Sequence, residues 1–186
     1  MFGAITPPQE LPLTVMTDKM VIRGTALTRV RRLTDLVAGP DTHYLVLQDA
    51  SFLELGSRRT VIQGASVQIP LSDVLFLHST APTESGATMR IPKAPVEATI
   101  LVPPFTVEGT IYLPWEAELR IALDAYMEQF LPVTAARYWA YGAAESSTSV
   151  DLLVVNHARA HVVIAAGVEW QSDSAPAAAD EGSNPW

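Results

Sequence analysis

The sequence predicts a mainly β, α+β protein made of two tandem small barrel- or sandwich-like units, each with one helix. Short runs rich in Val, Ile, Leu and Thr alternate with turn residues along the chain. Residues 20–27 (MVIRGTAL) are echoed about 85 residues later at 105–112 (FTVEGTIY), and residues 44–50 (YLVLQDA) about 86 residues later at 130–136 (FLPVTAA). Two echoes in the same order at nearly one offset indicate a duplicated unit.

Composition shifts along the 186-residue chain set the expected boundaries. Thr, Ser, Pro and Gly dominate residues 80–96, where no apolar period survives, so this segment is expected to be a linker. The remaining expected parts are an N-terminal arm at 1–12, a first β-rich unit at 13–79, a second at 97–168 and an acidic tail at 169–186.

In the first unit, strands are expected at 13–17 and 20–27, around a turn at Asp18-Lys19. Thr28 is expected to cap a short helix over 29–38, which Gly39-Pro40 ends. Further strands are expected at 44–47, 52–55, 61–62, 67–69 and 74–77. Gly24 lies in mid-strand, which predicts a bend or bulge there.

In the second unit, strands are expected at 97–102 and 105–113, with Gly109 in the place of Gly24. An amphipathic helix is expected over 115–130, because its apolar residues follow a helical period: Leu119, Ala122, Leu123, Tyr126, Met127 and Phe130. Strands at 133–141, 150–155 and 161–166, with a turn at 156–159, complete the unit.

The net charge of −8 disfavours nucleic-acid binding, which needs a basic surface. The charge is unevenly divided, at +1 for residues 1–93 and −9 for residues 94–186, which is typical of two different partners, of head-to-tail self-association, or of neutral drift. The chain has no cysteine and no apolar run long enough to span a bilayer, and its first residues do not resemble a signal peptide. We expect a cytoplasmic location, with the periphery of a membrane complex as the alternative.

Few residues in the sequence indicate a metal-binding or catalytic role. His157 and His161 have the spacing of a helical metal site, but they flank an expected turn, so we expect no metal. His43 and His78 fall at strand ends and are interpreted as boundary residues. In the echo, Asp49 aligns with Ala135 and Asp73 with Ala160, so neither carboxylate is required by the fold. No phosphate loop, nucleophile elbow or zinc-protease motif is present, and no catalytic residue or cofactor is predicted.

The candidate interaction residues are a basic cluster and several aromatic positions. Three arginines in four positions could bind an acidic partner or lipid headgroups, or simply cover a solvated helix face. Tryptophans occur only in the second half, where Trp139 is expected in the core. The chain ends on an aromatic residue after an acidic stretch, as a docking peptide would. The interaction set is Arg29, Arg31, Arg32, Trp115, Trp170, Pro185 and Trp186.

One pattern resembles an uncharacterised bacterial family of small β-rich domains, a family that implies no established activity. The pattern consists of Thr17-Asp18, Ile22-x-Gly24-Thr25, Leu33-x-Asp35-Leu36 and Tyr44-Leu-x-Leu-x-Asp49-Ala50. The order of strands is also faintly similar to an Sm-like barrel. The chain departs from that barrel in lacking an Arg-Gly closing motif and in its inserted helix, so the resemblance does not imply RNA binding.

Together these observations favour a non-catalytic accessory or scaffolding subunit of a larger bacterial protein assembly, docking through its terminal arms. Its partners are expected to be proteins in a multi-subunit complex, with no nucleic acid. Two alternatives remain open: a small-ligand-binding or sensory module, and an enzyme without a recognisable motif.

Overall fold

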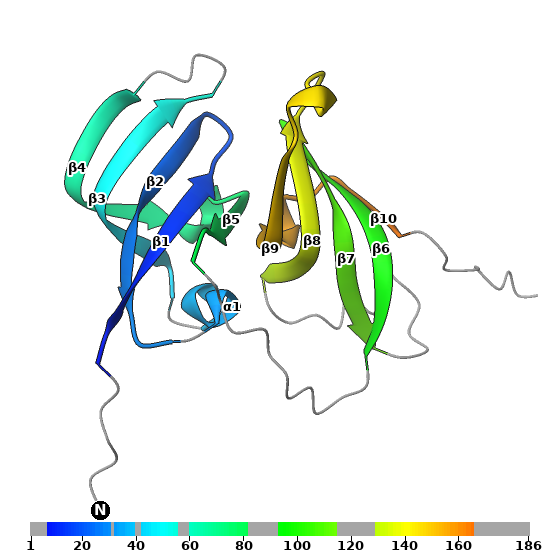
Figure 1. Ribbon diagram of the computed structural model, residues 1–186, viewed down its shortest axis with the longest axis horizontal. Helices are drawn as coiled ribbons and strands as arrows, with labels where there is room; N and C mark the ends of the chain where they lie inside the picture. Colours follow the sequence, from blue (N-terminus) through cyan, green and yellow to red (C-terminus); the bar gives the residue numbers. More distant parts are fainter. Residues whose placement is uncertain are drawn as a thin grey trace, which may run out of the picture.

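The computed structural model describes residues 7–30, 32–39, 42–55, 60–81, 93–114 and 129–165. These residues form one antiparallel sheet of ten strands in the order β10-β6-β7-β8-β9-β5-β1-β2-β3-β4 (Figure 1). The prediction of a mainly β protein is confirmed. Among the described residues, there is no helix with the length and apolarity needed to cross a membrane.

The sheet divides into an N-terminal half, strands β1 to β5, and a C-terminal half, strands β6 to β10. The N-terminal half consists of β1 (Gln9–Met16), β2 (Met20–Thr28), α1 (Leu33–Val37), β3 (Tyr44–Glu54), β4 (Thr60–Pro70), the 3-10 turn η1 (Leu71–Asp73) and β5 (Phe76–Ser79). The C-terminal half consists of β6 (Lys93–Val102), β7 (Phe105–Pro114), β8 (Phe130–Ala140), η2 (Ala144–Ser146), β9 (Thr148–Asn156), η3 (His157–Arg159) and β10 (Val162–Ala165).

The two halves have the same strand order, since the last strand pairs with the first and the next three follow in sequence: β5-β1-β2-β3-β4 and β10-β6-β7-β8-β9. Their registers also correspond. Leu13 pairs with Gly24 as Ala98 pairs with Gly109, an offset of 85 residues. From the third strand onward the offset is 86 residues, as in the pairs Tyr44–Pro70 and Phe130–Asn156.

Both halves bend at the same place. The register of β2 against β3 shifts at Gly24, and that of β7 against β8 shifts at Gly109, as the mid-strand glycines predict. A Cβ on Gly109 would lie 2.8 Å from the carbonyl oxygen of Thr134, so no other residue fits without a shift. The residues left out of the two ladders, Asp49 and Ala135, have φ values of 49° and 47°, in the left-handed region. A bulge therefore interrupts each half at equivalent positions.

Two hydrophobic clusters form the core, and each takes side chains from both halves. The cluster of the C-terminal half also contains Leu75 and Phe76 of the N-terminal half. The cluster of the N-terminal half, which includes both buried residues of α1, also contains Phe130 and Val154 of the C-terminal half. Because each core is completed by the other half, the two halves pack as one body.

Several element boundaries differ from the sequence-based expectation. β1 begins at Gln9, inside the segment expected to be an arm, because residues 9–12 continue the ladder with β2. The helix is one turn, Leu33–Val37, without a side-chain cap, and Thr28 instead accepts a hydrogen bond from the N–H of Val30. β3 and β4 are each one strand of 11 residues rather than two short ones, because a bulge lets β3 continue past Asp49.

Two further differences concern aromatic residues of the C-terminal half. Phe130, expected at the end of a helix, is the first residue of β8; the rest of that expected helix lies outside the described residues, apart from Gln129, which forms a bend. Trp139, expected in the core, is only half-buried, and the Arg137 guanidinium lies 5.0 Å from its ring centroid. The neighbouring Tyr138 points inward instead, because the two sides of a strand alternate.

Candidate functional site

The two halves meet where β5 pairs with β9, in the middle of the sheet (Figure 1). Three residue pairs make this ladder: Phe76–Val155, Leu77–Val154 and His78–Leu153. We call this ladder, with the side chains packed around it, the internal interface. It joins the fourth strand of the C-terminal half to the fifth strand of the N-terminal half.

Asn156 is the main polar contact of the internal interface. Its side chain has no exposed surface, and its backbone N–H donates to the carbonyl oxygen of Leu75 at 2.9 Å. Its Nδ2 donates to the carbonyl oxygens of Leu71 at 3.3 Å and Val74 at 3.0 Å. Asn156 therefore donates to three backbone acceptors of the N-terminal half, of which the carbonyl oxygen of Leu71 also accepts from the N–H of Val74.

A second polar contact lies beside it, between the two 3-10 turns. Arg159 of η3 donates from its Nη1 to the carbonyl oxygen of Ser72 in η1, at 2.8 Å. Ser72 is followed by Asp73, so a cationic side chain of the C-terminal half lies against an acidic turn of the N-terminal half. Electrostatic complementarity of this kind favours one register of association over others.

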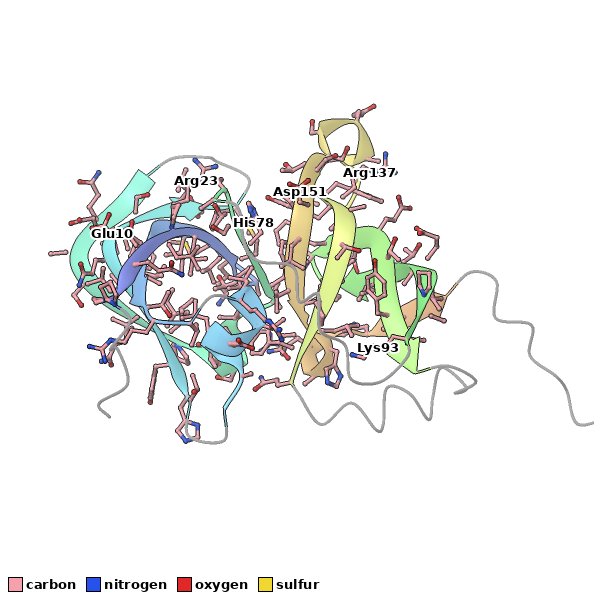
Figure 2. The ribbon with its side chains drawn as sticks, turned by 60° about the horizontal axis from the view of Figure 1, so that its bottom comes forward. Glu10, Arg23, His78, Lys93, Arg137 and Asp151 are labelled. Atoms are coloured by element: carbon pink, nitrogen blue, oxygen red, sulfur yellow. The ribbon has the colours of Figure 1, made fainter. Side chains whose placement is uncertain are left out.

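A buried histidine and tyrosine also meet across the internal interface. His78 Nε2 lies 3.2 Å from the Tyr138 hydroxyl, and the two rings are 5.7 Å apart. Tyr138 packs in turn on Phe76, with ring centroids 5.0 Å apart. Figure 2 shows His78 between the two halves, with Arg23 beside it on the N-terminal side. This cluster gives the interface an aromatic centre.

The surroundings favour the neutral forms of His78 and Tyr138. Burial lowers the pKa of the His78 imidazole, and the positive charge of Arg23 lowers it further. Burial also raises the pKa of the Tyr138 hydroxyl, against weaker opposing effects of Thr148 and Arg23. Nδ1 of His78 has no hydrogen-bond partner among the described residues. The pair is arranged to stabilise the interface, since a neutral hydrogen bond between aromatic groups tolerates burial.

The start of β8 is covered by the other half, whereas the equivalent positions of the N-terminal half, at the start of β3, are exposed. Phe130 is 2% exposed because it packs in the N-terminal core, whereas its equivalent, Tyr44, is 56% exposed. Val46, the equivalent of the half-buried Pro132, is 46% exposed. We call Tyr44 and Val46, with their β4 partners Gln68 and Pro70, the exposed patch. Exposed apolar groups of this size often mark an interaction surface.

The exposed patch borders an outer edge of the sheet. Among the described strands, β4 and β10 each pair with a single neighbour, β3 and β6. Neither strand contains a charged residue over its whole length. Natural proteins usually protect such edges with charged side chains, because an unpaired edge is a template for strand addition. We call β4 and β10 the free edges.

The predicted interaction residues are only partly described. Arg29 and Arg32 are both exposed, one after β2 and the other directly before α1. The other members of the set lie outside the described residues: Arg31, Trp115, Trp170, Pro185 and Trp186. Of the two described members, neither Arg29 nor Arg32 belongs to the ladder or to the side-chain contacts of the internal interface.

The histidines and aspartates singled out in the sequence are all described. His157 begins η3 and His161 follows it, so the expectation of a turn at 156–159 is confirmed. The described residues contain no group of three or more His, Asp or Glu side chains that could hold a metal ion. His43 directly precedes β3 and His78 is the last residue but one of β5, as expected for residues near strand ends, and His78 is also buried. The register aligns Asp73 with Arg159 rather than with Ala160.

Sequence reasoning missed the residues that make the internal interface: His78, Tyr138, Asn156 and the exposed patch. One signal was available, because the echo itself pairs Tyr44 with Phe130 and so places an aromatic residue at the start of both third strands. Comparisons of the chain with protein-family models, with curated proteins and with solved structures found no match.

Proposed function

We propose that this protein is a non-catalytic scaffolding subunit of a larger bacterial protein assembly, built from two tandem copies of one barrel- or sandwich-like unit. The shared strand order, the registers offset by 85 and 86 residues and the paired bulges support the duplication. Two copies joined edge to edge make a building block whose outer edges, β4 and β10, are the strands equivalent to β9 and β5 of its internal interface.

The exposed patch beside an uncharged free edge is the observation that carries this proposal. Tyr44 is 56% exposed in a position whose equivalent is buried by docking. Aromatic side chains dominate the energetics of protein interfaces, since they bury a large area at little entropic cost. A partner protein that covers this patch would satisfy the β4 edge and bury the tyrosine in one step.

The basic residues offer a second contact with a partner. Arg29 and Arg32 are both exposed near the start of α1, where an acidic protein surface or anionic headgroups could bind them. A cytoplasmic assembly, or one at the periphery of a membrane, is compatible with such contacts. The terminal segments, including Trp170 and Trp186, are proposed as additional docking arms.

A sensory role is a second candidate, and the buried His78–Tyr138 pair favours it. Because burial disfavours the charged imidazole, protonation of His78 would weaken the internal interface. This role would require that the two halves respond to pH or to a ligand within the range the protein meets.

Isolation of the tagged full-length chain from its native host, followed by native mass spectrometry, tests the proposed function. We expect a complex of fixed stoichiometry that contains several polypeptides. A matched pair of variants, Tyr44→Asp and Tyr141→Asp, locates the contact, since both tyrosines are about half exposed, at 56% and 51%, and only Tyr44 belongs to the exposed patch. Isolation of wild-type protein as a monomer without any partner would contradict the proposal.

A further inference from the structure

Two equivalent halves allow two pairings of a fourth strand with a fifth strand, and we call each such pairing a joint. The internal interface is one of these two joints. Within the chain, the fourth strand of one half, β9, pairs with the fifth strand of the other, β5. The remaining fourth strand is β4 and the remaining fifth strand is β10, and these are the free edges. A second copy of the chain can therefore form the same joint again, with its β10 on the β4 of the first.

We infer that copies of this chain associate head to tail through these edges, with β4 of one copy antiparallel to β10 of the next. The internal interface sets the register of this external joint by the offset of 86 residues. The expected pairs are Ile69–Val162, Gln68–Val163 and Val67–Ile164, the equivalents of Val155–Phe76, Val154–Leu77 and Leu153–His78. This inference rests on the proposed function and names the partner as a second copy.

The exposed patch fits this partner. In the internal interface, Phe130 and Val154 pack in the same cluster as Leu71, Val74 and Leu77. At the external joint, Tyr44 and Gln68 would occupy the places of Phe130 and Val154. The receiving positions, equivalent to Leu71, Val74 and Leu77, are His157, Ala160 and Val163, which are all half-buried. The tyrosine would thus meet His157, Ala160 and Val163 where the phenylalanine meets Leu71, Val74 and Leu77.

Hydrogen bonds within each half show that the receiving surfaces are built alike. The N–H of Leu75 donates to the carbonyl of Met16 at 2.8 Å, and the N–H of His161 donates to that of Leu101 at 2.8 Å. The N–H of Leu71 donates to the carbonyl oxygen of His43, and the N–H of His157 donates to the carbonyl oxygen of Gln129. The backbone leading into β10 therefore has the same shape as the backbone leading into β5.

Opposite charges face each other at both joints, but the acidic and the basic residue change sides. The internal interface places Arg159 of η3 against η1, the turn that contains Asp73. At the external joint, the equivalent of Arg159 is Asp73, and it would lie against η3 of the next copy, the turn that contains Arg159.

One substitution makes the external joint weaker than the internal one. Pro70 stands in the place of Asn156, so it has no N–H to donate and cannot make the two side-chain hydrogen bonds. The external joint therefore forms reversibly and depends on protein concentration. Because the two surfaces that meet are different, association is heterologous and produces a ring or an open filament.

Sedimentation velocity of the recombinant full-length chain alone, over a range of concentrations, tests this inference. We expect oligomers that grow with concentration. Tyr44→Asp should weaken association about tenfold or more, as the loss of an interface anchor does. Tyr141→Asp is the matched control and should leave association unchanged.

Two one-sided variants test the head-to-tail arrangement. Backbone alternation from the Asn156 hydrogen bond places the N–H of Val154 toward β5, so the N–H of the equivalent Gln68 points to the free edge of β4. Gln68→Pro blocks β4, and Val163→Pro blocks β10 in the same way. Each variant alone should be a monomer, and an equimolar mixture should form a 1:1 dimer, since each retains one edge. Circular dichroism establishes that both variants are folded.

Each result has a distinct meaning. Dimers formed by one variant alone would indicate pairing of like edges and would overturn the inference. A wild-type chain that stays monomeric at the highest attainable concentration would also overturn it, and the scaffolding function would stand if the native complex contains other proteins. If Val163→Pro fails to fold, a mixture of Gln68→Pro with wild type decides, because the variant should cap and shorten the wild-type oligomers.

Discussion

The starts of β3 and β8 occupy the same place in their halves, and their surroundings differ completely. Phe130 at the start of β8 and its β9 partner Asn156 are buried against the other half, whereas their equivalents Tyr44 of β3 and Pro70 of β4 lie beside an outer edge. The fold alone therefore does not decide whether this surface is covered. The internal interface is therefore permanent and fixed by the hydrogen bonds of Asn156, whereas the external joint between β4 and β10 has an aromatic anchor, Tyr44, without those hydrogen bonds.

The largest effect is expected from truncation of the two aromatic equivalents. Phe130→Ala should lower the free energy of unfolding by about 3–5 kcal/mol, since it removes a side chain that fills the N-terminal core. Tyr44→Ala should lower it by less than about 1 kcal/mol, because the side chain is exposed. Urea denaturation at low protein concentration measures both, and equal losses would show that the comparison is wrong.

Replacement of the buried amide should have the next largest effect. Asn156→Asp keeps the shape but sets a carboxylate against two backbone carbonyl oxygens, so we expect a loss of about 3 kcal/mol in the free energy of unfolding. Pro70→Ala, at the equivalent position, should change stability by less than about 1 kcal/mol. A loss below about 1 kcal/mol for Asn156→Asp would mean that these hydrogen bonds do not hold the halves together.

Acid should weaken the internal interface through His78. Because the folded-state pKa of His78 is lowered by burial and by Arg23, the unfolded chain binds the proton more readily than the folded one. Stability from this group is complete above the unfolded pKa, near 6.5, and is lost as the pH falls through the folded pKa. His78→Gln retains a hydrogen-bonding group without titration, so its unfolding should depend less on pH between neutral and mildly acidic conditions. Identical pH profiles for both proteins would contradict this assignment.

The smallest effect concerns the paired bulges. Ala135 has a φ of 47°, a conformation that costs an alanine about 1–2 kcal/mol, whereas glycine adopts it freely at an entropic cost of about 0.5–1 kcal/mol. Ala135→Gly should therefore raise stability by about 0.5 kcal/mol. Asp49→Gly should gain less, since Asp tolerates this region better than Ala. Thermal unfolding measures both, and a destabilising Ala135→Gly would indicate that the methyl group is needed for packing.

Local signals in the sequence predicted much of each half. Mid-strand glycines predicted the bends at Gly24 and Gly109, and alternating apolar residues predicted most strands. Strand continuity could not be predicted, because Asp49 adopts a left-handed conformation that keeps β3 unbroken through polar residues. The helix was predicted to be longer than the one turn observed, because the apolar period on which the prediction rests continues into residues that lie outside the helix.

The contacts of the internal interface could not be predicted from local sequence patterns. His78 looks like the end of a short apolar strand, and its burial depends on Tyr138, 60 residues away. Asn156 looks like a turn residue, because Asn is common in turns, and its three acceptors lie more than 80 residues away in the sequence. Contacts of this kind come from how the two halves pack, which no single segment encodes.

Hydrogen–deuterium exchange at low and high protein concentration tests whether copies of the chain associate through β4 and β10. We expect the backbone amides that point to the free edges, those of Ser66 and Gln68 in β4 and of Val163 in β10, to become protected as concentration rises. Amides at 62–63, on the same strand but outside the expected register, should exchange at an unchanged rate. Protection that appears elsewhere, or edges that exchange equally fast at all concentrations, would contradict assembly through β4 and β10.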